Sequence, residues 1–241
     1  MIISGNFTNP LSLFVTSNED IYVDDGEKNH RVQKWIAKTK TFVTVMKVKV
    51  SCFSLFVTND TLYCSMWVQD QVVKRWLNDS DTTSTIVAAG TGVPGSALNQ
   101  LNSPRGIFVD MNFDLYIADS ENNRIQLWHL GESSGITVAG EGSANPTINL
   151  DRPNGVVLDG EKYLFIVDRG NHRIVGSGLN GFRCLVGCGG WGSQTNQLSS
   201  PTSFSFDRSG NMFVVDSMNN RIEKFVYLES CLGKEKRSSI R

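Results

Sequence analysis

Aspartate and arginine residues recur in pairs along this chain, and such charged pairs can either do chemistry or hold structure. The pairs are Asp25 and Arg31, Asp119 and Arg124, Asp168 and Arg173, and Asp216 and Arg221. They could form a ring of charge that faces a ligand. Alternatively, each aspartate could cap an Asn-rich turn while the planar guanidinium group ties that turn to its neighbour. Binding sites usually use residues that break a repeat, so the recurrence favours the structural interpretation.

Histidine and cysteine are the other residue types that could support catalysis or bind a metal. His30 and His172 each precede a motif arginine in a turn, and His129 follows a strand elsewhere, so we do not expect the three to converge on a metal. The 5 cysteines are an odd number and do not recur at one repeat position, which argues against a disulfide framework. Cys184 and Cys188 are the exception, because they are close enough to pair or to share a metal.

Other signatures of catalysis are missing from the sequence. There is no Gly-x-Ser-x-Gly motif, no phosphate-binding loop and no acid–base pair that spacing can place. We therefore expect no catalytic residue, no cofactor and no metal.

The charged pairs belong to a repeated unit whose clearest copy is Asn102 to Trp128. Three short apolar runs in it, Ile107 to Asp110, Leu115 to Ala118 and Ile125 to Trp128, are separated by polar turns. Runs this short predict strands rather than helices. The other copies begin at Asn9, Ser51, Arg152 and Ser200. The copy at Ser51 is the weakest, since it has Cys52 in place of the proline and lacks both the aspartate and the arginine.

A period in the forties with several short strands per unit is typical of a β-propeller. The units share a Pro-x-Gly opening, an apolar strand, a second strand that ends in aspartate, and then Asn-x-Arg-Ile. This pattern closely resembles the NHL repeat family. The resemblance implies a propeller fold, and propellers of this kind include metal-dependent lyases and hydrolases, RNA-binding domains and binding scaffolds.

The five copies predict a five-bladed β-propeller over residues 1–230, followed by a basic tail over residues 231–241 that we expect to be disordered. The chain opens with Ile2 to Gly5, which matches the fourth strand of later units, and the last unit has no equivalent run. We therefore expect the N-terminal strand to complete the last blade and close the ring. The alternative is a six-bladed ring from which one blade is missing.

The composition is that of an ordinary globular protein: 40% hydrophobic and 20% charged residues, with a net charge of -1. No global basic field would attract nucleic acid. The chain shows neither a signal peptide nor an apolar run of membrane-spanning length, which predicts a cytoplasmic protein without a membrane partner. We also expect a monomer. Glycosylation sequons begin at Asn6, Asn59 and Asn78, but such short matches do not settle the compartment.

Two places break the repeat with large apolar side chains. In the weakest unit, Met66 and Trp67 occupy the polar turn, and Trp191 lies among glycines in CGGWGS. These side chains could fold back into a gap between blades, or they could be exposed anchors for a partner. We predict a non-catalytic scaffold that binds a protein or peptide through Met66, Trp67 and Trp191. The alternatives are an RNA-binding propeller and a metal-dependent lyase or hydrolase.

Overall fold

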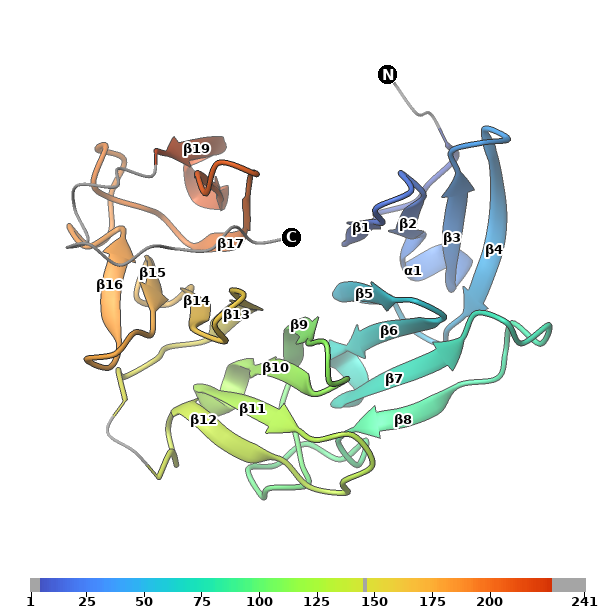
Figure 1. Cartoon of the computed structure of the whole chain (residues 1–241), viewed down its shortest axis with the longest axis horizontal. Coiled ribbons are helices and arrows are strands. Elements are labelled where there is room, and N and C mark those ends of the chain that lie inside the picture. The colour runs from blue at the N-terminus through green and yellow to red at the C-terminus, as the bar shows by residue number, and fades with distance from the viewer. Residues whose placement is uncertain (1–4, 145–146, 227–241) are drawn as a thin grey trace. The chain divides into compact units, whose positions relative to one another are not determined.

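The computed structural model describes residues 5–144 and 147–226, whose regular secondary structure is almost entirely β-strand. The strands form five antiparallel sheets that follow one another along the sequence (Figure 1). Four sheets have four strands, and the last has three within the described residues. This is the all-β organisation that the repeats predict. In the same part of the chain, no helix is long and apolar enough to cross a membrane.

The chain divides into two compact units, Met1–Leu115 with Trp128–Gly135, and Tyr116–Leu127 with Ile136–Arg241. The strands of the first two sheets are β1 (Leu13–Val15), β2 (Ile21–Asp24), β3 (Arg31–Ile36), β4 (Thr41–Lys47), β5 (Ser54–Thr58), β6 (Thr61–Met66), β7 (Gln71–Trp76) and β8 (Ile86–Ala89). The third sheet consists of β9 (Pro104–Val109), β10 (Leu115–Asp119), β11 (Arg124–Trp128) and β12 (Ile136–Gly140). The last two sheets consist of β13 (Pro153–Leu158), β14 (Leu164–Asp168), β15 (Arg173–Gly176), β16 (Arg183–Val186), β17 (Pro201–Phe206), β18 (Met212–Asp216) and β19 (Arg221–Phe225).

The core of the first unit lies between the first two sheets. Tyr22, Val32 and Met46 from the first sheet pack against Leu55 and Leu62 from the second. The strand β5 also contacts β9, so that neighbouring strands lie on both sides of its sheet. Every residue of β6 is accordingly buried. This double coverage explains why the middle strands are continuous apolar runs rather than alternating ones.

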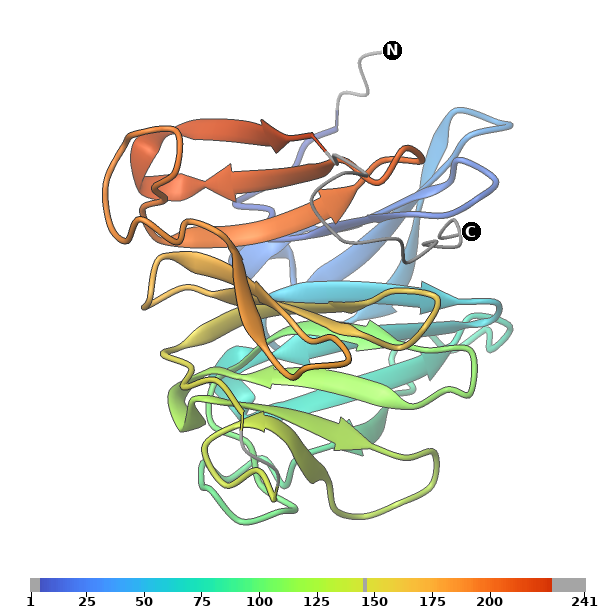
Figure 2. The ribbon, with the colours of Figure 1, turned by 60° about the vertical axis from the view of Figure 1, so that its left-hand side comes forward.

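The second unit has a comparable core between the sheets β13–β16 and β17–β19, which lie one over the other in Figure 2. Phe165 and Val167 from one sheet pack with Phe204 and Val214 from the other. The rings of Phe165 and Phe206 meet edge to face, with centroids 5.2 Å apart. The sheets are therefore joined by buried side chains rather than by backbone pairing.

Short helical turns join the second and third strands of four sheets. They are α1 (Gly26–Asn29), η1 (Trp67–Gln69), η2 (Ser120–Asn122) and η3 (Ser217–Asn219). Each turn ends in a residue with left-handed backbone, namely His30, Asp70, Asn123 and Asn220. His172 has the same conformation in the fourth sheet, with a φ of 56°. These residues reverse the chain so that the third strand can pair with the second.

The third strand carries an aromatic residue in every sheet except the fourth, whose β15 has none. Trp35 and Trp128 are buried, but Trp76 is 52% exposed. The strand β4 extends beside Trp35, which is opposite Phe42. In contrast, β8 begins at Ile86 opposite Lys74, so that Trp76 lies beyond the paired segment.

Some features predicted from the sequence lie outside the described residues. The proposed closing strand, Ile2 to Gly5, is described only at Gly5, and the basic tail over residues 231–241 is not described.

Candidate functional site

Each motif aspartate has a side chain with no exposed surface and is paired with the Nε atom of its arginine. The distances from Nε to Oδ2 are 2.6 Å for Arg31 and Asp25, 2.7 Å for Arg124 and Asp119, and 2.8 Å both for Arg173 and Asp168 and for Arg221 and Asp216. The arginines differ in exposure: the side chain of Arg124 is 6% exposed and that of Arg31 is 36% exposed. Water can therefore compete with some of these pairs more easily than with others.

The aspartates also receive hydrogen bonds from the turn and from the connection that enters the sheet. A turn asparagine donates its side-chain amide to each one: Asn29 to Asp25, Asn122 to Asp119, Asn171 to Asp168, and Asn219 to Asp216. Backbone N–H groups of the connections donate to the Oδ1 atoms: Thr8 to Asp25, Asp151 to Asp168, and Ser199 to Asp216. One buried carboxylate thus joins two backbone segments.

The arginines reach the same connections through their terminal nitrogens. Arg221 donates to the carbonyl oxygen of Ser193 at 2.9 Å and to that of Gln197 at 3.0 Å. Arg173 donates to the carbonyl oxygen of Asn149 at 2.8 Å. The donors of the guanidinium groups are directed at backbone oxygens, so we continue to interpret the pairs as structural.

In three sheets the residue that ends the turn also makes the same contact with the following connection. Asp70 accepts a hydrogen bond from the N–H of Ser103 at 2.8 Å through Oδ1. Asn123 accepts one from Arg152 at 2.9 Å in the same way. In the fourth sheet the acceptor is Nδ1 of His172, 3.0 Å from the N–H of Ser200. The side chain of His172 therefore has the structural task that Asp70 and Asn123 have elsewhere.

The other two histidines lie in different surroundings. His30 ends the first turn, and its N–H donates to the carbonyl oxygen of Gly26 at 3.3 Å. The Nδ1 atom of His129 lies 3.1 Å from Oδ1 of Asp114. Within residues 5–144 and 147–226, no group of three or more His, Cys, Asp or Glu side chains is arranged to hold a metal ion.

The second sheet lacks the charged pair, and its predicted partner-binding residues separate into buried and exposed ones. Met66, in the aspartate position, is only 4% exposed and belongs to the core of the first unit. Trp67 is 36% exposed and Val68 is 58% exposed. The connection after β8 passes beside them, because a Cβ atom at Gly92 would lie 3.8 Å from the carbonyl oxygen of Gln69. Val93 follows in that connection and is also exposed.

Trp191 is 71% exposed in the connection between β16 and β17. Two hydrogen bonds fix the backbone of this connection: the N–H of Gly192 donates to Leu198 at 3.2 Å, and that of Gln197 donates to Gln194 at 3.0 Å. The connection before β9 has the same two bonds at the same distances, from Gly95 to Leu101 and from Gln100 to Ala97. Pro94 precedes the glycine there, in the place of Trp191. The loop conformation therefore does not require a tryptophan.

A second exposed apolar side chain lies close to Trp191 in the same unit. The indole Nε1 of Trp191 donates to Oγ of Ser199 at 3.0 Å, and the backbone N–H of Met218 donates to the carbonyl oxygen of Ser199 at 3.1 Å. Met218 is 71% exposed. The result is an apolar surface on a loop and a turn that are both held by hydrogen bonds.

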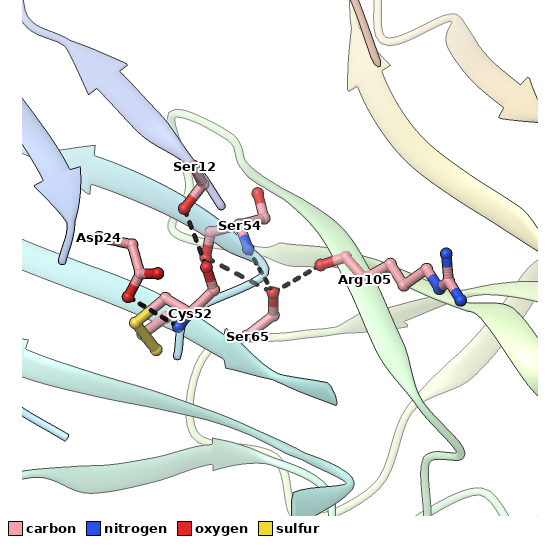
Figure 3. The surroundings of a disulfide bond; sticks show 7 residues. Ser12, Asp24, Cys52, Ser54, Ser65 and Arg105 are labelled. Carbon is pink, nitrogen blue, oxygen red and sulfur yellow. Dashed lines mark hydrogen bonds between the residues drawn. A yellow bond between two sulfur atoms is a disulfide. The ribbon is translucent and has the colours of Figure 1, made fainter. Parts of the chain in front are cut away.

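Two polar residues that sequence reasoning missed lie near the start of β5. Asp24 and Ser65 occupy the strand position that Val167 and Val215 fill in the last two sheets. Oδ1 of Asp24 accepts a hydrogen bond from the N–H of Cys52 at 3.0 Å, and Oγ of Ser65 donates to the carbonyl oxygen of Arg105 at 2.6 Å (Figure 3). The sequence signal that could have identified Asp24 and Ser65 is a polar side chain at a repeat position that is apolar in the other units.

Burial changes the acidity of Asp24. Its side chain has no exposed surface, and removal from water raises the pKa of this carboxyl group from 3.8 to about 6. The hydrogen bond from the N–H of Cys52 opposes this shift without cancelling it.

Four cysteines form two disulfides, so the expectation of no disulfide framework is wrong for Cys52 and Cys64, whereas Cys184 and Cys188 form the pair that their spacing allowed. Cys52, just before β5, is bonded to Cys64 in β6, and both are fully buried. Cys184 in β16 is bonded to Cys188, four residues later. The fifth cysteine, Cys231, lies outside the described residues.

Comparison with known proteins gives a likeness of fold rather than of sequence. No family model and no curated protein matches the chain. An auxiliary nutrient binding protein from Bacteroides ovatus aligns with 92% of this chain and 60% of its own, at 15% identity and a TM-score of 0.66. A streptogramin B lyase aligns with 92% of this chain and 70% of its own, at 13% identity and a TM-score of 0.64. A chain from a nidogen/laminin complex aligns with 90% and 80%, at 18% identity and a TM-score of 0.61.

These solved structures are β-propellers, and together with the five antiparallel sheets they define this protein as a five-bladed β-propeller. The chain spans less than two thirds of some of its neighbours, 60% of the Bacteroides ovatus protein and 47% of a related protein from Bacteroides thetaiotaomicron. Identities this low show the fold alone. Membership of the NHL family therefore stays a prediction.

Proposed function

We propose that this propeller is a binding scaffold that captures a protein or peptide partner through the exposed apolar residues of its turns and connections. One observation carries the proposal: Trp191 is 71% exposed, and its loop does not need it, because the loop before β9 has the same two backbone hydrogen bonds with Pro94 in the equivalent position. Large apolar side chains are seldom left in water without a use. A tryptophan that the loop conformation does not require, and that is mostly exposed to water, is suited to anchor a partner.

The two candidate contact surfaces lie one in each unit. The Trp191 patch consists of Trp191 and Met218, and the Trp67 patch consists of Trp67, Val68 and Val93. The Trp191 patch is built on segments with fixed backbone hydrogen bonds, so little conformational entropy is lost when a partner binds there. Met66 supports the Trp67 patch from the core rather than touching the partner.

The fold neighbours support a binding role in general terms. Two of them are auxiliary nutrient binding proteins, and a third comes from a complex between two proteins. The streptogramin B lyase shows that a propeller of this shape can also carry an enzyme. No described residue cluster in this chain favours a lyase mechanism over binding, so we place binding first.

The cysteines support a proposal about the compartment. Disulfides persist in oxidising compartments and are rare in the cytosol. With Cys52 bonded to Cys64 and Cys184 to Cys188, we place the protein in an oxidising environment, in place of the cytoplasm that sequence reasoning suggested.

A displayed library of random peptides tests the binding proposal. Peptides selected on the folded chain should be rich in apolar residues, and Trp191→Ala should weaken their binding at least tenfold, since anchor residues cost more than about 1.4 kcal/mol when truncated. Leu179→Ala is the matched control: Leu179 is 74% exposed in the same unit, in the turn between β15 and β16, at the other end of β16 from Trp191.

The same peptides separate the two patches. Loss of binding in Trp67→Ala but not in Trp191→Ala would move the contact to the first unit. Equal binding by the parent chain, by both tryptophan variants and by the Leu179 control, with all four folded, would contradict the proposal.

A further inference from the structure

Two glycosylation sequons lie at one end of the sheet formed by β5 to β8. Asn59 and Asp60 form the turn between β5 and β6, and Thr61, the third residue of the first sequon, begins β6. Asn78 follows the last residue of β7 by two positions. The two turns touch, because the N–H of Leu77 donates to the carbonyl oxygen of Asp60 at 2.6 Å. Both asparagines are exposed. Within the described residues, neither side-chain amide has a hydrogen bond to another residue.

The same sheet contains the buried disulfide between Cys52 and Cys64. An oxidising compartment of a eukaryotic cell is also the place where sequons are glycosylated. Exposed sequons and disulfides are independent features of this chain, and both are explained by passage through a secretory pathway.

Exposed apolar residues lie in the same sheet as the second sequon. Trp76, two positions before Asn78, is 52% exposed, and on the outer strand β8 Ile86 is 48% and Val87 is 54% exposed. An apolar outer strand with free backbone groups invites association with other chains. A bulky, soluble glycan on Asn78 would lie over this surface and oppose such association.

We propose that Asn59 and Asn78 carry N-linked glycans. In the transfer, the side-chain amide nitrogen bonds to the anomeric carbon of an oligosaccharide donated by a polyisoprenyl diphosphate. The bond between that carbon and the diphosphate oxygen breaks, the amide loses one proton, and the polyisoprenyl diphosphate leaves.

The glycosylated end is remote from the Trp67 patch. The strand β6 runs from Thr61, in the first sequon, to Met66, next to Trp67. Five residue steps of a strand span roughly 17 Å. Glycans on Asn59 and Asn78 would therefore leave the Trp67 patch accessible. The proposal does not depend on the binding function.

The test uses the full chain directed through the secretory pathway of a eukaryotic cell, with Asn6→Gln to remove the third sequon. Intact mass, measured on protein from medium and cell extract before and after peptide N-glycosidase, should show two glycans. Asn59→Gln and Asn78→Gln should each lose one. Ser80→Ala should lose the glycan of Asn78, whereas the matched variant Ser80→Thr should keep it.

Aggregation provides a second measurement. Asn78→Gln should form more soluble oligomer than Asn59→Gln on size-exclusion chromatography, because only the former exposes Trp76 and β8. Unmodified Asn59 and Asn78 peptides in this protein, or free thiols at Cys52 and Cys64, would overturn the proposal. Equal amounts of soluble oligomer in the two variants would contradict the proposal that the Asn78 glycan covers Trp76 and β8.

Discussion

The Oδ1 atom of Asp24 lies 3.0 Å from the backbone nitrogen of Cys52 and fixes the residue that begins the disulfide to Cys64. The carboxyl group that makes this contact has no exposed surface, and its pKa is raised to about 6 by burial. Keeping such a group ionised in the fold costs on the order of 3 kcal/mol, from about 1.4 kcal/mol for each pH unit between 3.8 and 6.

The first prediction follows from this shift. Between pH 3.8 and about 6 the folded chain keeps the proton of Asp24 while the unfolded chain has lost it, so the contribution of Asp24 to stability falls as pH rises through this window. Asp24→Asn, which keeps an oxygen for the N–H of Cys52, should be more stable than the parent chain at pH 7. The difference should shrink toward zero near pH 4, as measured by urea unfolding at each pH.

Asp60→Asn is the control for this measurement, since Asp60 is exposed in the turn between β5 and β6. It tests whether the loss of an exposed carboxyl group alone gives the pH dependence expected of Asp24→Asn. A difference for Asp24→Asn that is constant from pH 4 to pH 7 would contradict the assigned pKa shift.

A second prediction concerns the unequal burial of the charged pairs. Arg124→Ala removes a guanidinium group that is only 6% exposed and that pairs with the buried carboxylate of Asp119. The free energy of unfolding should fall by about 3 kcal/mol. Arg31→Ala should cost only about 1 kcal/mol, because its side chain is 36% exposed and water already competes with the pair. The urea concentrations at the midpoints of unfolding show which of the two variants loses more stability. Equal losses would show that exposure does not set the strength of these pairs.

The third prediction concerns reduction of the disulfides. Cys188 is exposed, whereas Cys52 and Cys64 have no exposed surface. Dithiothreitol should therefore open the bond between Cys184 and Cys188 in the folded protein, and leave the other until the chain unfolds. Alkylation followed by peptide mass spectrometry gives the order. Loss of the buried bond should cost about 3 kcal/mol, as expected for a loop of this size, and early labelling of Cys64 would contradict the prediction.

The strands could be predicted from the sequence because local composition decides them. The run from Leu115 to Ala118 is apolar and bounded by polar turns, and it forms the fully buried β10. The pair of Cys52 and Cys64 could not be predicted, because it depends on the register in which Leu55 lies opposite Cys64. Register depends on how two strands pair, so it cannot be predicted from the residues of either strand alone.

The exposure of individual side chains could not be predicted from the sequence either. Met66 and Trp67 are neighbours in one apolar stretch, yet Met66 is 4% exposed and Trp67 is 36% exposed. The reason is that Met66 ends β6 and points into the core, whereas Trp67 begins the turn η1. The sequence identified both as breaks in the repeat, and only the fold shows that one side chain is buried and the other is exposed.

The last prediction tests the repeated contact at the end of each turn. His172 has a left-handed backbone with a φ of 56°, and its Nδ1 atom accepts the hydrogen bond of the Ser200 N–H at 3.0 Å. Asn123 combines the same conformation with the same contact in the preceding sheet. His172→Asn should therefore keep the stability of the parent chain, because asparagine tolerates this conformation and supplies an acceptor. His172→Ala removes the acceptor and places a less tolerant residue in the left-handed conformation. The unsatisfied N–H and the strained backbone should together lower the free energy of unfolding by about 2 kcal/mol. Thermal unfolding of the two variants measures the difference, and equal melting temperatures would show that the side chain of His172 does not hold the connection to β17.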